Sequence, residues 1–154
     1  MIAPTRFWKQ VEAHRGRGIL VLGLLTSWKP TADLIGRDAV DVASGMFDVV
    51  CNLAFSSADA RARLSTTVIG AYWADEQDVS AVVAWLDRWV PLVISSGENT
   101  FQVNIRTLSL ERTAKESGRE LYRKAQSELA TLVGSLPKSE QYPAMDASWE
   151  DAAG

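Results

Sequence analysis

The chain has 154 residues, of which 47% are hydrophobic and 23% charged, and its formal net charge is −3. This length accommodates one domain with a substantial core, and the composition is that of a globular protein, not of a disordered or fibrous one. The acidic balance excludes a general attraction to nucleic acid or to an anionic membrane, and leaves only local contacts with nucleic acid inside a larger assembly.

The charge is divided unevenly between the two ends of the chain. Residues 1–17 carry four basic side chains and one acidic one, whereas residues 138–154 carry one basic and four acidic side chains. We therefore predict a single globular domain over 1–137 and an acidic C-terminal tail over 138–154. The tail spaces three large side chains, Tyr142, Met145 and Trp149, between polar residues, a pattern typical of a segment that docks on a partner.

The most hydrophobic stretch follows the basic lead-in and covers residues 19–25. Its seven residues are far fewer than the roughly 20 that a membrane-spanning helix needs. Gly16 and Gly18 precede the run, whereas a dinucleotide-binding loop places its glycines after a strand. Leu24 and Leu25 stand where a phosphate-binding P-loop requires Lys and Ser or Thr. The stretch is therefore predicted to form one wall of the core.

Residues 31–55 give the clearest helical pattern in the chain. Apolar side chains recur there every three or four residues, at Ile35, Ala39, Val42, Ala43, Met46, Val50 and Leu53. Val40, Phe47 and Cys51 widen this face, which is typical of a central helix contacted on two sides. Asp38, Asp41 and Asp48 fall on the remaining arc, where solvent exposure is expected. Cys51 has no local positive charge to activate a thiolate, so we expect a small buried hydrophobe.

A second amphipathic helix is predicted over residues 76–94. Asp75 or Asp78 provides an N-cap, and Pro91 bends or ends the helix. Trp85 and Trp89 lie one helical turn apart and share a face. A paired aromatic surface of this kind is typical of interface hot spots.

The segment from residue 99 to residue 137 carries two competing patterns. A stripe with spacings of three and four predicts a helix, above all over 110–136, whereas residues 100–108 alternate apolar and polar side chains as a strand does. The same ambiguity affects residues 18–26 and 66–73. Few turn residues interrupt these segments, so we predict a mostly α fold, a bundle of about five helices. The alternative is an α+β fold with short strands near 18–26, 66–73 and 100–108.

The residue types exclude several chemistries. His14 is the only histidine and Cys51 the only cysteine, so a zinc site and a histidine-based catalytic triad lack their components. The basic side chains of the last helical segment, Arg112, Lys115, Arg119 and Arg123, are interrupted by glutamates and form a solvated face. We therefore predict no catalytic, cofactor-binding or metal-binding residue, no cofactor and no enzymatic activity.

The resulting functional prediction is a protein-interaction or structural adaptor subunit of a larger assembly, for example a phage particle. It would bind protein partners, including copies of itself, and would be located in the cytoplasm or within the assembled particle. The expected contact residues are Trp8, Trp85, Trp89, Tyr142, Met145 and Trp149. Two alternatives remain: an immunity or antitoxin protein that caps a basic target, and a small-ligand enzyme with an apolar pocket between helices.

Overall fold

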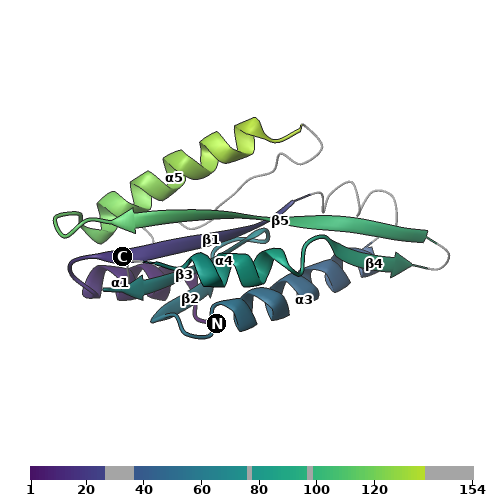
Figure 1. Cartoon of the computed structure of the whole chain (residues 1–154), viewed down its shortest axis with the longest axis horizontal. Coiled ribbons are helices and arrows are strands. Elements are labelled where there is room, and N and C mark those ends of the chain that lie inside the picture. Colours follow the sequence, from purple (N-terminus) through teal and green to yellow (C-terminus); the bar gives the residue numbers. More distant parts are fainter. Residues whose placement is uncertain (27–36, 76–77, 97–98, 138–154) are drawn as a thin grey trace.

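The computed structural model describes residues 1–26, 37–75, 78–96 and 99–137. This part of the chain contains helices, single strands and two pairs of consecutive strands (Figure 1), in the order α1 (Pro4–Ala13), β1 (Gly18–Thr26), α3 (Arg37–Ala54), β2 (Ala60–Arg63), β3 (Val68–Ala74), α4 (Ser80–Asp87), β4 (Leu92–Ser96), β5 (Asn99–Arg112) and α5 (Gly118–Ser135). None of the described helices is both long enough and apolar enough to cross a membrane.

The five strands form one antiparallel sheet in the order β2-β3-β1-β5-β4. β1 is the central strand, and every one of its nine residues is buried. Successive side chains of a strand point to opposite faces, so a strand covered on both sides needs apolar residues at consecutive positions. This explains the continuous apolar run that the sequence shows at residues 19–25.

Helices cover both faces of the sheet and give the molecule three layers. Ile19 and Val21 of β1 pack into a core shared with α3 and α4, whereas Leu20 and Leu22 pack into a second core shared with α1 and α5. Figure 1 shows β1 and β5 running side by side as two long strands, with α5 on one side and α3 and α4 on the other.

The prediction of a mostly helical bundle is wrong, and the chain has an α+β fold. All three segments named as alternative strands are strands: β1 covers 18–26, β3 covers 68–74 and β5 covers 99–112. The helix predicted over 110–136 begins only at Gly118, because the preceding residues belong to β5. In this strand Val103 and Ile105 pack into the core on one face of the sheet, and Leu110 packs into the core on the other face. Tertiary pairing along β1 decides between the two patterns, and no local sequence window contains that information.

The two other predicted helices are present with shorter bounds. α3 agrees with the helix predicted over 31–55 where the structure describes it, and residues 27–36 lie outside the described part. The helix predicted over 76–94 is reduced to α4, because the chain turns after Arg88 and enters β4 at Leu92. The tail 138–154 lies outside the described residues.

Candidate functional site

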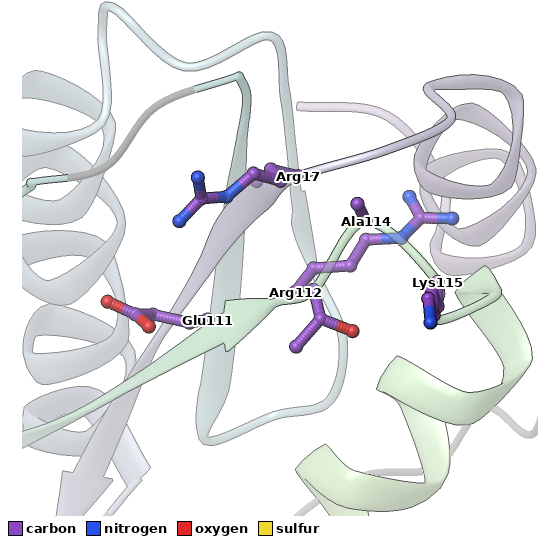
Figure 2. A pocket seen from close by; sticks show the side chains of 7 residues that line it. Arg17, Glu111, Arg112, Ala114 and Lys115 are labelled. Atoms are coloured by element: carbon purple, nitrogen blue, oxygen red, sulfur yellow. The ribbon is translucent and has the colours of Figure 1, made fainter.

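A cavity of about 540 Å³ opens where β1 begins and β5 ends (Figure 2). Gly18 and Arg112 face each other in the register of these two strands, so both strands terminate at the same edge. The lining residues are Arg17, Gly18, Glu111, Arg112, Thr113, Ala114 and Lys115. This volume lies within the range of about 300–1,000 Å³ that is usual for small-molecule sites.

Arg112 is the buried base of the cavity, with only 3% of its surface exposed. Its Nη1 donates to the carbonyl oxygen of Val11 at 2.8 Å, to that of His14 and to the Tyr72 hydroxyl at 3.1 Å, and its Nε donates to the carbonyl of Glu116 at 3.0 Å. A guanidinium offers five donors in a rigid planar fork, so one side chain can hold several segments at fixed distances. Arg112 thus joins the end of α1, β3 and the loop that precedes α5.

Glu12 and Glu116 complete this framework below the cavity. The carboxylate of Glu12 accepts a hydrogen bond from the backbone N–H of Gly118 at the start of α5 and lies 3.9 Å from Nη2 of Arg112. Glu116 accepts from the N–H of Thr113 at 2.9 Å and pairs with Lys124 at 3.4 Å. Partial burial acts to raise the pKa of Glu116, but the Thr113 hydrogen bond and the Lys124 ammonium outweigh it and lower that pKa.

Charged side chains at the mouth of the cavity are exposed and can contact a ligand. Arg17 and Glu111 extend to the same side of the strands, and Lys115 lies on the loop that leads into α5 (Figure 2). The backbone of Arg17 is fixed because its carbonyl accepts a hydrogen bond from Asp75 N–H at 2.7 Å. Arginine and lysine side chains placed in this way bind phosphate or carboxylate groups, and arginine can do so with two parallel hydrogen bonds.

A second groove adjoins the cavity and carries the opposite charge. It has a volume of about 660 Å³, lies between α4 and the sheet, and includes Asp78, Asp87 and the shared Glu111. The backbone N–H of Ser80 donates to Asp78 at 2.8 Å, and this hydrogen bond lowers the pKa of Asp78. Cationic groups at the cavity and carboxylates in the groove together suit a ligand that combines an anionic group with hydrogen-bond donors.

The described residues do not fit a divalent metal or a thiol nucleophile. Among them, no group of three or more His, Cys, Asp or Glu side chains converges on a point where a metal ion could be held. Burial raises the pKa of Cys51 to about 12, with the nearby Arg63 charge acting in the opposite direction. A thiol in that environment stays protonated and packs as a small apolar group, as the sequence predicted.

The predicted contact residues have different locations. Trp8 is fully buried between α1 and α5, where its ring meets those of Phe7 and Tyr122 edge-on, so it is part of the core of the domain and is not exposed to a partner. Trp85 packs against the α3 core, and its ring centroid lies 5.7 Å from that of Trp89, which is 51% exposed. The other three, Tyr142, Met145 and Trp149, lie outside the described residues. No sequence signal singled out Arg17 as a cavity residue.

Comparison with known proteins identifies the fold. No protein-family model matches the sequence, and no curated protein is similar to it. Among solved structures, the GGDEF domain of DgcB from Caulobacter crescentus in complex with c-di-GMP has a TM-score of 0.65 at 18% identity, covering 92% of this chain and 84% of that one. The GGDEF domain of TpbB (YfiN) from Pseudomonas aeruginosa has a TM-score of 0.68 at 12% identity, covering 97% and 87%.

A third structure adds a named activity to this set of similar folds. The active GGEEF domain of a diguanylate cyclase from Vibrio cholerae has a TM-score of 0.63 at 13% identity, covering 84% of this chain and 88% of that chain. The chain therefore has the fold of GGDEF domains. Neither the run GGDEF nor the run GGEEF occurs in its sequence.

This fold overturns the functional prediction made from the sequence. The structural adaptor, for example of a phage particle, was predicted as a mostly helical protein, and the structure instead has the α+β fold of GGDEF domains. The prediction of no enzymatic activity is contradicted as well, because the fold is shared with a domain described as an active diguanylate cyclase.

Proposed function

We propose that this chain is a domain of guanine-dinucleotide signalling that binds c-di-GMP. The likeness to the DgcB domain solved with c-di-GMP extends over 92% of the chain and supports this choice of ligand class. The observation that carries the proposal is the pairing of a cationic cavity with an acidic groove through the shared residue Glu111.

Each half of this surface matches one part of such a ligand. The phosphates of a cyclic dinucleotide are anions, and Arg17 and Lys115 supply cations at the cavity mouth. The guanine edge offers N–H donors, and carboxylates such as Glu111 and Asp87 accept from them. Phosphoryl transfer from nucleoside triphosphates needs divalent ions held by grouped carboxylates, which the described residues do not form, so no step through a metal is derived.

Isothermal titration of the full chain with c-di-GMP tests the proposal, with GTP and c-di-AMP as comparison ligands. We expect binding of c-di-GMP that weakens about tenfold or more in Arg17→Ala and in Lys115→Ala, because one hydrogen bond to a charged group contributes roughly 1.5–3 kcal/mol. Arg123→Ala on the exposed side of α5 is the matched control and should bind as the unmodified chain does.

Two results would count against the proposal. Absence of c-di-GMP binding contradicts the function, and binding unaffected by either cavity variant contradicts the site. The same samples should also be incubated with GTP and Mg²⁺ and analysed by chromatography, because conversion of GTP would show that the domain has a synthetic activity in addition to binding.

A protein partner and a cytoplasmic location belong to the same proposal. The diguanylate cyclase SiaD from Pseudomonas aeruginosa, whose fold matches with a TM-score of 0.61 at 15% identity, was solved in complex with its activator SiaC. By analogy, we expect proteins, including a second copy of this chain, to contact the domain. The cytoplasm supplies the guanine nucleotides that such a domain would respond to.

A further inference from the structure

The wall of the cavity between the end of β5 and the start of α5 is a closed turn. The backbone N–H of Glu116 donates to the carbonyl oxygen of Thr113 at 3.2 Å, and the N–H of Thr113 donates to the Glu116 carboxylate at 2.9 Å. These two hydrogen bonds run in opposite directions and close residues 113–116 into one unit. Lys115, a cation at the mouth of the cavity, is carried on this turn.

Lys124 of α5 joins this turn to the end of β5. Its Nζ donates to the carbonyl oxygen of Glu111 at 2.7 Å. The same Nζ lies 3.4 Å from Oε1 of Glu116, and this oxygen is the one that accepts from the Thr113 N–H. An ammonium group is a compact charge with three donors, so it can hold a carbonyl and a carboxylate at the same time.

The end of β5 has limited support within the sheet. β4 pairs with residues 99–103, whereas residues 104–112 pair with β1 alone among the described strands. A strand end that is paired on one side only opens more easily than one paired on both sides. The hydrogen bond from Lys124 to the Glu111 carbonyl gives this end a second support, from α5.

Lys124 is not among the residues that line the cavity or the groove. Its ammonium is occupied by its two acceptors, and 37% of its side chain is exposed. Glu111, by contrast, lines both spaces, and its side chain extends to the same side of the strands as Arg17 (Figure 2). Lys124 therefore acts on a ligand through the groups that it holds.

We propose that Lys124 is a positioning residue for the c-di-GMP site, which fixes Glu111 and the turn carrying Lys115 relative to each other. This inference rests on the proposed function and extends it to the choice of base. Phosphates are common to all cyclic dinucleotides, but guanine offers N–H donors where adenine N1 is an acceptor. A carboxylate held in place accepts from guanine and repels the adenine lone pair, whereas a displaced one does neither.

Titration with c-di-GMP, and competition by c-di-AMP, tests the inference. We expect the unmodified chain to prefer c-di-GMP about tenfold or more. Lys124→Met keeps a long side chain without the charge, and should lower the c-di-GMP affinity about tenfold and reduce the preference. Lys124→Arg keeps the charge and the donors and should restore most of both. Arg123→Met, at the adjacent exposed position, removes the same charge and should change neither.

A double-variant cycle separates positioning from a general effect on the fold. Glu111→Gln should lose most of the preference for c-di-GMP by itself. Adding Lys124→Met to Glu111→Gln should not reduce the preference further, because the carboxylate that Lys124 positions is already gone. A merely structural role of Lys124 would weaken both dinucleotides equally and leave the preference intact.

Amide hydrogen exchange measures the same role without a ligand. The Thr113 N–H should exchange faster in Lys124→Met and slowly again in Lys124→Arg, because the Glu116 carboxylate that accepts from it loses its partner in the first variant. The amide of Val21, in the buried central strand, is the internal reference and should exchange equally slowly in all three proteins.

The outcomes distinguish this inference from the proposed function. Absence of c-di-GMP binding to the unmodified chain contradicts the proposed function, and exchange at Thr113 then still decides whether Lys124 fixes the wall. If c-di-GMP binds and Arg17→Ala weakens it, an unchanged affinity and preference in Lys124→Met overturns this inference alone. An equal loss for both dinucleotides, or unchanged exchange at Thr113, overturns it as well.

Discussion

The Tyr72 hydroxyl of β3 fills the space beside Gly18 of β1 into which a Cβ would project. The same Cβ would stand only 2.8 Å from the carbonyl oxygen of Trp73. The hydroxyl is itself held by Arg112, so it cannot move aside without breaking that hydrogen bond. Gly18 is therefore required by packing at the edge where the candidate cavity opens.

Gly18→Ala should destabilise the fold by about 1–3 kcal/mol, which is the usual cost of forcing extra atoms into a packed site. The free energy of unfolding in urea measures this. Gly134→Ala, where the added methyl group meets nothing within 4 Å, is the control and should be neutral or slightly stabilising. Equal stability of the two variants would contradict the packing argument.

Arg112→Lys should cost about 2–4 kcal/mol, because lysine keeps the charge but cannot reach the separate acceptors that the guanidinium fork serves. The free energy of unfolding in urea again measures this cost. Arg123→Lys on α5, an exposed position, should change the free energy of unfolding by less than about 0.5 kcal/mol. An unchanged free energy of unfolding in Arg112→Lys would show that the positive charge, and not the set of hydrogen bonds, stabilises the fold.

Glu116 should make stability depend on pH on the acid side. Its pKa in the folded chain is lowered from the ordinary value of 4.5, so the folded state favours the carboxylate more than the unfolded state does. The stabilisation is complete above the unfolded pKa and is lost as the pH falls through the folded pKa. Glu116→Gln should therefore lose more stability near neutral pH than in acid.

Unfolding of Glu116→Gln and of the unmodified chain at about pH 6 and about pH 3.5 gives the measurement. The difference between the two proteins should shrink at the lower pH. Glu128→Gln on the exposed side of α5 serves as the control. A pH-independent difference would mean that the hydrogen bond to Thr113 does not require the charged form.

Cys51 should be almost unreactive in the folded chain. Burial raises its pKa to about 12, so very little thiolate is present near neutral pH, and reagents cannot reach the sulfur. We expect slow modification by a thiol-specific disulfide reagent in buffer and fast modification in urea. Fast labelling without denaturant would show that the α3 core opens readily.

The sequence predicted the character of several segments correctly but not their partners. The apolar run at 19–25 was expected to wall a core, and it does so as the central strand, but its strand conformation depends on β3 and β5. In residues 99–112 two periodicities coexist, and only pairing with β1 selects the strand. The periodicity of a short segment does not reveal which distant strand the segment pairs with.

The helical face of α3 illustrates a second limit. The predicted core side included Val42 and Leu53, yet both are more than half exposed, while Phe47 and Cys51 occupy the centre of the core. Two arcs of this helix are apolar, and periodicity cannot tell which one faces the sheet. The cavity was not predictable at all, because Arg17 and Lys115 are nearly 100 residues apart and meet only through the β1–β5 pairing.

The central position of β1 has a consequence for how the chain is made. Both neighbours of this strand, β3 and β5, come later in the sequence, and its last pairing partner is complete only at Arg112. During synthesis the most apolar segment of the protein therefore leaves the ribosome with neither edge satisfied. Until residue 112 has emerged, this strand is the segment that chaperones would have to shield from aggregation.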